Sequence, residues 1–344
     1  MKLPRNAQIW LPGYLTSWNW ALPRRGTVWL SICDHFEPLW HKPDRQTAAG
    51  RVAAWRRLWP EIAARHPDSR GRPAQYTFFY PEEEYAPEYL DPLAEIAAGG
   101  TGAIEVHLHH DGESEPHFVD RMQRFLEVLH TRHGALHKSA GKIRFGFIHG
   151  NWALDNSLED GRYCGLNNEI TLLRDLGCYA DFTLPSAPSS AQTRMVNRIY
   201  WATDDPERPK SHDWGIPVRP GGPVEGDLMM IPGPLGIRWL AHGRRIPRIE
   251  AGEIAGYDLP TAARVRLWLR VAPRLGDHIF IKLFAHGTQE RNLHPMLSGG
   301  LDALFRLIAE ECTLRGYRYH FVTARQMWEA VEAIRCGAGA NLGE

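Results

Sequence analysis

The sequence predicts an α/β fold in which parallel strands form a barrel. Apolar stretches of strand length alternate with helical segments of roughly 10 to 20 residues, which is typical of βαβ units. About seven such strands can be counted, a number that fits a barrel. Polar side chains also follow the strand ends, where barrels carry their reactive residues. These side chains are Asp34-His35, His107 with its neighbours, His149, Asp181 and His286.

The first hundred residues predict two strands and two helices. Residues 28–33 are largely apolar and read as a buried strand that ends at Asp34-His35. Residues 45–66 space their large apolar side chains as a helix does, with a kink or break expected at Pro60. Residues 76–80 form a second, aromatic strand that Pro81 stops, and a helix over 87–98 closes at Gly99-Gly100.

The most informative stretch is Ile104-Glu105-Val106-His107-Leu108-His109-His110-Asp111. Its even positions from 104 to 108 are apolar, and its odd positions from 105 to 109 are polar. This period of two predicts a strand with one packed face and one face that does chemistry or binds an ion. The alternative is a solvated strand end.

The rest of the chain continues the alternation, with one interruption. Helices are predicted over 116–130, 167–176, 261–271 and 301–314, and strands over 143–148, 179–183, 227–232, 278–285 and 319–322. Thr323 is expected to cap a final helix. Residues 185–226 are rich in Pro and Gly and show no periodicity, so we expect an irregular functional insertion or a mobile lid there.

The expected organisation is a single domain over 28–334, with an N-terminal lead-in over 1–27 packed on the barrel and a flexible C-terminal tail over 335–344. A length of 344 residues is compatible with one α/β barrel. Forty basic and 40 acidic side chains give zero formal net charge, which argues against a nucleic-acid partner.

The composition also favours a cytoplasmic protein. The five cysteines form no CxxC pair, and an odd count without a pairing pattern fits reduced thiols. Pro12 and Gly13 interrupt the apolar residues near the N-terminus, so no cleaved signal peptide is expected. No run approaches the roughly 18 apolar residues of a membrane span.

In order and spacing, these segments resemble the polysaccharide deacetylase family, carbohydrate esterase family four. Asp34-His35 stands where the family has an Asp-Asp pair, and residues 102–111 look like the segment whose first histidine binds a metal. Residues 76–81, 228–232, 281–286 and 318–326 are similar to further family segments, and the resemblance covers roughly residues 28 to 331. It implies a distorted (β/α)7 barrel of the polysaccharide deacetylase and glycoside hydrolase type.

The sequence departs from the family at the metal ligands. His35 replaces the second aspartate of the pair. The family's two histidines four residues apart become His107 and Asp111, with His109 and His110 between them.

The resemblance implies a divalent metal, for which zinc is the expected ion because the imidazole of His35 replaces a carboxylate. Such an ion lowers the pKa of a bound water to about 7. His107 and His35 are the first two candidate ligands. The third is left open between Asp111, His110 and His109, and His109 is equally suited to orient a ligand or contact substrate.

By the same resemblance, Asp34 is the candidate general base and His286 the general acid that protonates the leaving amine. Asp34 could instead be a fourth ligand, and His286 a buried barrel histidine. Asp181 is expected to orient His286 or bind substrate. Glu37 could hold a loop or contact the metal through water.

The sequence thus predicts a metal-dependent hydrolase that removes an acetyl or other acyl group from an N-acetylated sugar or polysaccharide precursor. Two alternatives remain open. One is a glycosidase that uses two carboxylates such as Asp34 and Asp181. The other is a non-catalytic sugar-binding protein with a degenerate site. A carbohydrate is the expected partner in every case, and the oligomeric state is left open.

Overall fold

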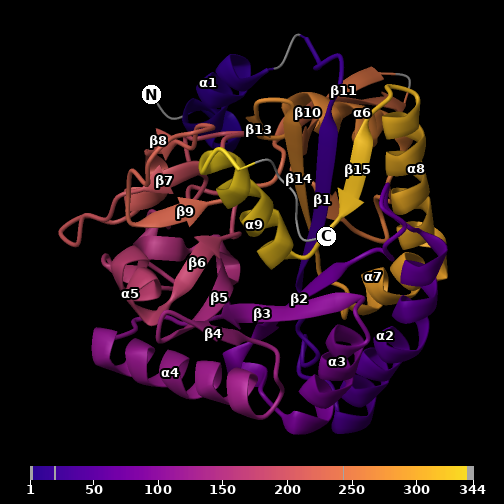
Figure 1. Cartoon of the computed structure of the whole chain (residues 1–344). Helices are drawn as coiled ribbons and strands as arrows, with labels where there is room; N and C mark the ends of the chain where they lie inside the picture. The colour runs from indigo at the N-terminus through magenta and orange to yellow at the C-terminus, as the bar shows by residue number, and fades with distance from the viewer. Residues whose placement is uncertain (1–2, 19–20, 243, 339–344) are drawn as a thin grey trace.

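The computed structural model describes residues 3–18, 21–242 and 244–338 and has a mixed α/β architecture around a mostly parallel sheet of 13 strands (Figure 1). The main path of the sheet runs in space through β12 (Glu253–Ile254), β14 (His278–Ala285), β1 (Thr27–His35), β2 (Tyr76–Pro81), β3 (Gly102–Leu108), β5 (Lys142–His149), β6 (Cys178–Asp181), β9 (Leu228–Met230), β7 (Tyr200–Ala202) and β8 (Ile216–Pro217). Three further strands pair with this path: β13 (Arg274–Leu275) with β14, β15 (Arg318–Phe321) with β1, and β4 (His137–Ser139) with β5. A separate antiparallel pair consists of β10 (Gly236–His242) and β11 (Arg244–Glu250).

The sheet is not closed, so the predicted parallel α/β arrangement is confirmed but the barrel is not. From β12 to β9 the neighbouring strands of the main path pair in parallel. The outer edge of β9 is then taken by β7, which pairs with it in antiparallel orientation and leads to β8. Both short strands come from the 185–226 segment, which is therefore less irregular than expected. Because β7 occupies that edge, β9 has no free edge with which to close the sheet.

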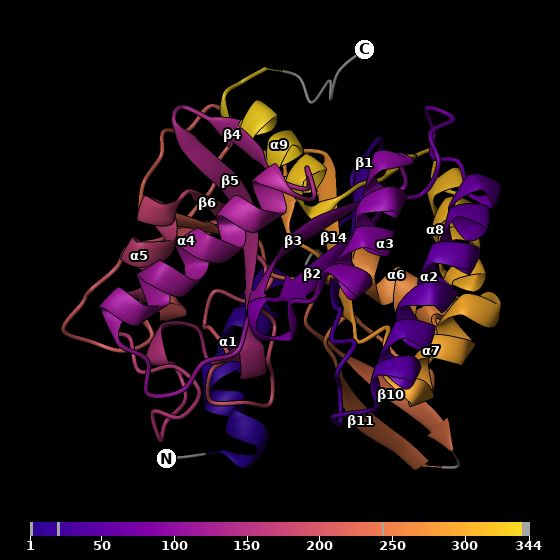
Figure 2. The ribbon, with the colours of Figure 1, turned by 90° about the horizontal axis from the view of Figure 1, so that it is seen from below.

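Most of the helices pack on one face of the sheet, around its two ends, and the last helix packs on the other face (Figure 2). The helices are α1 (Ala7–Ser17), α2 (Arg45–Arg65), α3 (Pro87–Ala98), α4 (Glu115–Thr131), α5 (Glu169–Leu176), α6 (Ala262–Val271), α7 (Glu290–Pro295), α8 (Leu301–Thr313) and α9 (Ala324–Arg335). Helices α2, α3 and α8 lie on one flank, and α4 and α5 lie on the other. Pro60 lies inside α2, which continues as one helix instead of breaking there.

Strand alternation produces two separate hydrophobic cores. In β1, Val28, Leu30 and Ile32 belong to the core that packs under the flanking helices. Trp29 and Cys33 belong to the other core, to which α9 contributes. Successive strand residues point to opposite faces, so one strand supplies both cores. The register also brings the carboxyl ends of β1, β3, β5 and β14 to one edge of the sheet.

The ends of the chain differ from the sequence-based expectation in detail. The lead-in contains α1, whose buried Trp10 and Tyr14 pack with Val196 and Leu235 in a small third core. The lead-in therefore packs on the segments around β7 and β10. The predicted tail falls partly outside the described residues, since α9 ends at Arg335 and description stops at residue 338.

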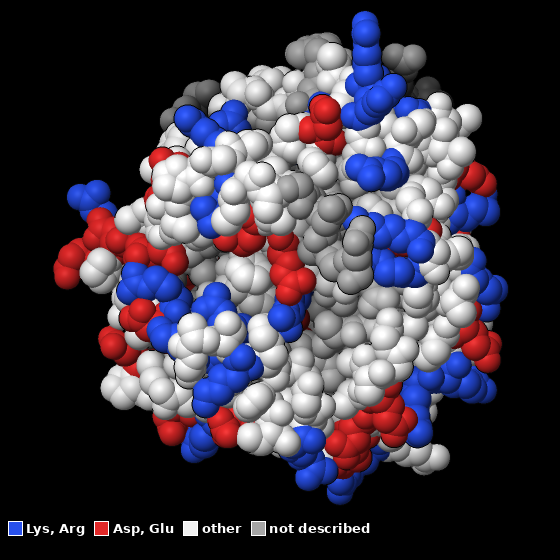
Figure 3. Space-filling view, in the orientation of Figure 1, with Lys and Arg blue, Asp and Glu red and all other residues white. Residues whose placement is uncertain are grey.

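The described surface carries both signs of charge. Basic and acidic side chains are interspersed over the face shown in Figure 3, in keeping with the zero formal net charge. Within residues 3–18, 21–242 and 244–338, none of the helices combines the length and apolar character that a membrane span requires.

Candidate metal sites at the carboxyl edge of the sheet

Three buried side chains at the carboxyl edge form a group that could hold a metal ion. His35 ends β1, Glu37 follows it by two residues, and His107 lies near the end of β3. One ligand atom from each side chain lies within 4.8 Å of the others, and all three residues are buried. His35 and His107 were predicted as ligands, and we call these three residues the first cluster.

The hydrogen bonds of His107 suit a cation in the first cluster. Its Nδ1 lies 2.8 Å from the carbonyl oxygen of Ile148, which can only accept, so Nδ1 carries the hydrogen. In a neutral ring Nε2 then has a lone pair, and it faces Glu37 Oε1 at 3.3 Å. Two lone pairs repel at this distance unless a proton or a metal ion lies between them. Glu37 Oε2 and His35 Nε2 are buried and have no hydrogen-bond partner among the described residues.

Two further histidines extend the first cluster toward solvent. His109 Nε2 lies 3.4 Å from Glu37 Oε1, and its Nδ1 pairs with Glu83. The ring of His286 is centred 4.8 Å from the ring of His35, and its Nδ1 has no partner among the described residues. Both histidines are partly exposed, so the first cluster is accessible from this side.

Burial and neighbouring charges set the protonation states in this region. Burial lowers the pKa of His35 well below 6.5, and the imidazoles of His286 and His107 lower it further. Burial alone would raise the pKa of Glu37, but the hydrogen bond and charge of His107 outweigh it and lower that pKa. For His109 burial is outweighed by Glu83, which raises the pKa of the imidazole. The cluster therefore combines a neutral His35 with an ionised Glu37.

A cavity of about 660 Å³ lies beside the first cluster. Trp152 and Phe284 line it, and the rings of both residues are centred 6.0–6.1 Å from that of His35. The remainder of the wall mixes small and apolar residues with charged ones such as Arg248 and Glu253. The cavity thus combines aromatic faces with charged hydrogen-bonding groups next to the metal-capable residues.

Asp34, the predicted general base, lies on the opposite face of β1 from His35. Its carboxylate accepts hydrogen bonds from the Gly287 amide at 2.8 Å and from the Tyr76 hydroxyl at 2.9 Å. Burial raises its pKa to about 7. Asp34 therefore fixes the backbone next to His286, which makes it a positioning residue for that imidazole.

Asp181 and Asp111 also make hydrogen bonds outside the first cluster. Both carboxylate oxygens of Asp181 accept from Thr183, one from its amide at 3.0 Å and one from its hydroxyl at 2.7 Å. Asp111 is exposed, and its carboxylate accepts from the Tyr163 amide at 2.8 Å. Asp34 and Asp181 thus make their hydrogen bonds with separate partners.

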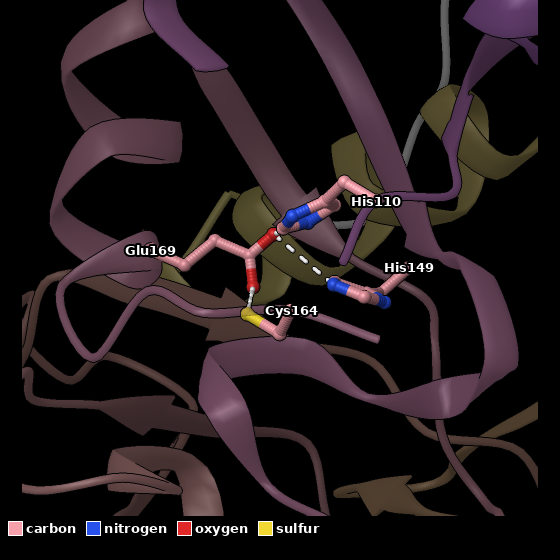
Figure 4. Close-up of side chains that lie close together, drawn as sticks. All are labelled: His110, His149, Cys164 and Glu169. Atoms are coloured by element: carbon pink, nitrogen blue, oxygen red, sulfur yellow. Dashed lines mark hydrogen bonds and ion pairs between the residues drawn. The ribbon is translucent and has the colours of Figure 1, made fainter. Parts of the chain in front are cut away.

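A second cluster holds His110, the remaining predicted ligand. His110, His149, Cys164 and Glu169 are all buried, and one ligand atom of each lies within 4.8 Å of the others (Figure 4). The two clusters take His107 and His110 from the same strand end. Residues 107–110 thus contribute ligands to two groups that could each hold a metal ion, whereas a single metal site was expected there from the sequence.

Sequence reasoning assigned Glu37 no certain role and did not group Cys164 and Glu169 with the histidines. Glu37 lies two residues beyond His35. In an extended chain this spacing points two side chains to the same face, so the sequence could have grouped them. Cys164 and Glu169 are five residues apart, but no spacing pattern links them to His110 and His149, which come from other segments. Searches with this sequence find no matching protein-family model, and no curated protein matches it.

Proposed function

We propose that this chain is a metal-dependent hydrolase that removes an acetyl or other acyl group from an N-acetylated sugar or a similar polar amide. The observation that carries the proposal is the geometry of the first cluster. Nδ1 of His107 donates a hydrogen bond to the carbonyl oxygen of Ile148, so Nε2 of the same ring faces Glu37, and His35 lies beside them. The resemblance of the strand-end segments to polysaccharide deacetylases supports the same reaction.

His35, Glu37 and His107 would hold the metal. Two imidazoles and one carboxylate suit zinc, and three protein ligands are the usual number at a catalytic zinc site. When bound, such an ion polarises the acyl carbonyl and lowers the pKa of water in the site. The backbone carbonyl of Ile148 would fix the tautomer of His107, as partners of ligating histidines generally do.

Proton transfer would fall to the two partly exposed histidines. A water adds to the acyl carbon and gives up a proton, for which His109 Nε2 is the proposed acceptor. The Glu83 carboxylate makes that imidazole more basic. The C–N bond then breaks, and the His286 imidazole gives a proton to the leaving amine. Asp34 holds the Gly287 amide and so positions His286.

The cavity beside the cluster supports a sugar substrate. Trp152 and Phe284 offer aromatic surface, and the charged groups around them can bind hydroxyls. We further propose that β14, β1, β2, β3, β5, β6 and β9 correspond to the seven strands of an incomplete barrel, whose gap lies at the edge that β7 covers.

The experiment compares His107→Ala with His117→Ala. His117 is an exposed histidine on α4, outside both clusters. Acetate release from a panel of N-acetylated oligosaccharides is measured alongside the metal content of each purified protein. We expect His107→Ala to lose turnover and the metal of the first cluster, whereas His117→Ala keeps both.

Chelation separates the proposed reaction from a two-carboxylate glycosidase. A chelator should abolish acetate release, and added zinc should restore it. Full activity of His107→Ala on a verified substrate, or new reducing ends formed without acetate, would refute the proposal.

A further inference from the structure

We propose that His110, His149, Cys164 and Glu169 bind a second metal ion, a structural zinc that is separate from the site of the proposed hydrolase. This second cluster lies at the same edge of the sheet but uses its own set of side chains. The inference does not depend on the proposed reaction, because it concerns binding and folding.

The four side chains converge on Glu169, as Figure 4 shows. His110 Nε2 lies 3.1 Å and His149 Nε2 3.5 Å from Glu169 Oε1. Cys164 Sγ lies 3.4 Å from Glu169 Oε2. One carboxylate therefore faces two imidazoles and a thiol in a space from which solvent is excluded.

The surrounding hydrogen bonds leave lone pairs directed into this space. His149 Nδ1 lies 2.6 Å from the carbonyl oxygen of Gly150, so it must donate, and the lone pair of Nε2 in the neutral ring faces the carboxylate. Nε2 of this fully buried histidine has no hydrogen-bond partner among the described residues. The arrangement is the one expected of an imidazole whose second nitrogen is oriented by a backbone carbonyl while the first binds a metal.

The sulfur of Cys164 is also placed as an acceptor. The backbone amides of Asn156 and Leu166 point to Sγ at 3.2 and 3.5 Å. The Asp155 amide donates to Glu169 Oε2 at 2.7 Å. Without a metal the Cys164 thiol donates to Glu169 Oε2, and burial raises the pKa of the thiol. A bound cation would displace that proton, and the amide donors would then offset the negative charge of the thiolate and the carboxylate.

The types of ligand atom in the second cluster favour zinc, and their burial favours a structural site over a catalytic one. A thiolate favours soft or borderline ions, and two imidazoles with one carboxylate complete four ligands. The side chains of all four residues are buried, which favours a site closed to water and substrate. Closed four-ligand coordination is typical of structural zinc, whereas catalytic zinc keeps a position open.

Such an ion would hold together four segments of the chain. His110 follows β3, His149 ends β5, Cys164 lies in the irregular stretch after it, and Glu169 begins α5. Between these ligands, several residues other than glycine have positive φ: Asn151, Trp152, Asp155, Asn156 and Tyr163. A metal cross-link would stabilise this unfavourable backbone, and with it the position of Trp152 in the cavity wall.

Cobalt substitution tests the inference, because a cysteine ligand gives Co²⁺ a sulfur-to-metal charge-transfer absorption that the first cluster, without cysteine, cannot produce. The metal-free full chain is titrated with Co²⁺. We expect the absorption in the native sequence and in His107→Ala. Cys164→Ser should lose the absorption and one equivalent of bound metal, while Cys312→Ser, which removes another buried thiol, should keep both.

A native chain without this absorption at saturating Co²⁺, or Cys164→Ser with an unchanged absorption, would overturn the inference. If Cys164→Ser fails to fold, alkylation of the native chain in mild denaturant replaces it. Zinc should slow the labelling of Cys164 and leave that of Cys312 unchanged. Equal labelling rates of Cys164 with and without zinc would contradict the proposal.

Discussion

Asp34 and His35 are neighbours in the sequence but serve different parts of the molecule. The alternation of β1 puts Asp34 on the face of Val28, Leu30 and Ile32, where it bonds Tyr76 and the Gly287 amide. His35 faces the other way, toward the first cluster. The same alternation was visible in the sequence, since the even positions of this strand are its aliphatic ones. A prediction based only on this alternation would have placed Asp34 and His35 on opposite faces of the strand.

Glu105 allows a residue-scale prediction of pH dependence. Burial raises its pKa to about 8, although hydrogen bonds from Tyr179 and the Gly146 amide oppose the shift. The folded state therefore holds this proton more tightly than the unfolded chain, whose glutamate has a pKa near 4.5. The resulting stability is fully present below pH 4.5 and is lost as the pH rises through about 8. Glu105→Gln should flatten this loss, measured by urea unfolding at several pH values.

The matched control is Glu127→Gln, which changes an exposed glutamate on α4. It should leave the pH dependence of the free energy of unfolding unchanged. A Glu105→Gln profile that overlays that of the native chain would show that this carboxyl does not govern the loss of stability between pH 4.5 and about 8.

At the scale of elements, the sequence predicted those with clear periodicity and missed those without it. Helix α1 contains Pro12 and Gly13, which argue against a helix, and it is held by the burial of Trp10 and Tyr14. The pair β10–β11 carries several arginines and Pro247, so its strands show no clean alternation. Tertiary packing decided these elements, and no local pattern records such packing.

The start of α9 gives a prediction at this scale. Thr323 was expected to cap the helix, and its side chain accepts from the Gln326 amide while Gln326 bonds back, forming a capping box. Thr323→Ala should therefore lower the free energy of unfolding by about 0.5–2 kcal/mol. Thermal or urea unfolding provides the measurement.

Ser114 serves as the comparison for that substitution. It occupies the same position before α4 but makes no side-chain capping bond. Ser114→Ala should change stability by much less than Thr323→Ala. Equal losses would mean that the cap hydrogen bond is not what stabilises α9.

At the scale of the whole molecule, the parallel order of the sheet was predictable but its open edge was not. Strand β7 has only three residues within a segment rich in Pro and Gly, and its pairing with β9 depends on tertiary contacts. The second cluster was equally hidden, because Cys164 and Glu169 meet His110 and His149 only through the folded arrangement of distant segments. Strand-end histidines could be found from sequence, whereas the way they divide between two clusters could not.

The attachment of β10–β11 to the body of the protein yields a prediction for the molecule as a whole. Glu250, at the end of β11, accepts two hydrogen bonds from Arg264 of α6, at 2.8 and 3.0 Å, and both side chains are buried. Glu250→Ala would leave the Arg264 charge buried without this partner. We expect a loss of about 3–5 kcal/mol in the free energy of unfolding.

An exposed ion pair supplies the contrast. Glu88 pairs with Arg45 at the surface, where solvent screens both charges, so Glu88→Ala should cost much less than Glu250→Ala. Denaturant midpoints of the two variants, measured side by side, make the comparison. A loss for Glu250→Ala as small as that for Glu88→Ala would show that the buried pair does not anchor β10–β11.

The end of β3 links the two clusters. His107 and His110 lie three positions apart and enter different clusters. His110 lies beyond the last residue of β3, Leu108, so its position depends on the length of the segment that follows the strand. Substitutions can alter either cluster independently, whereas a change in this spacing would move His110 relative to His107 and so disrupt the second cluster.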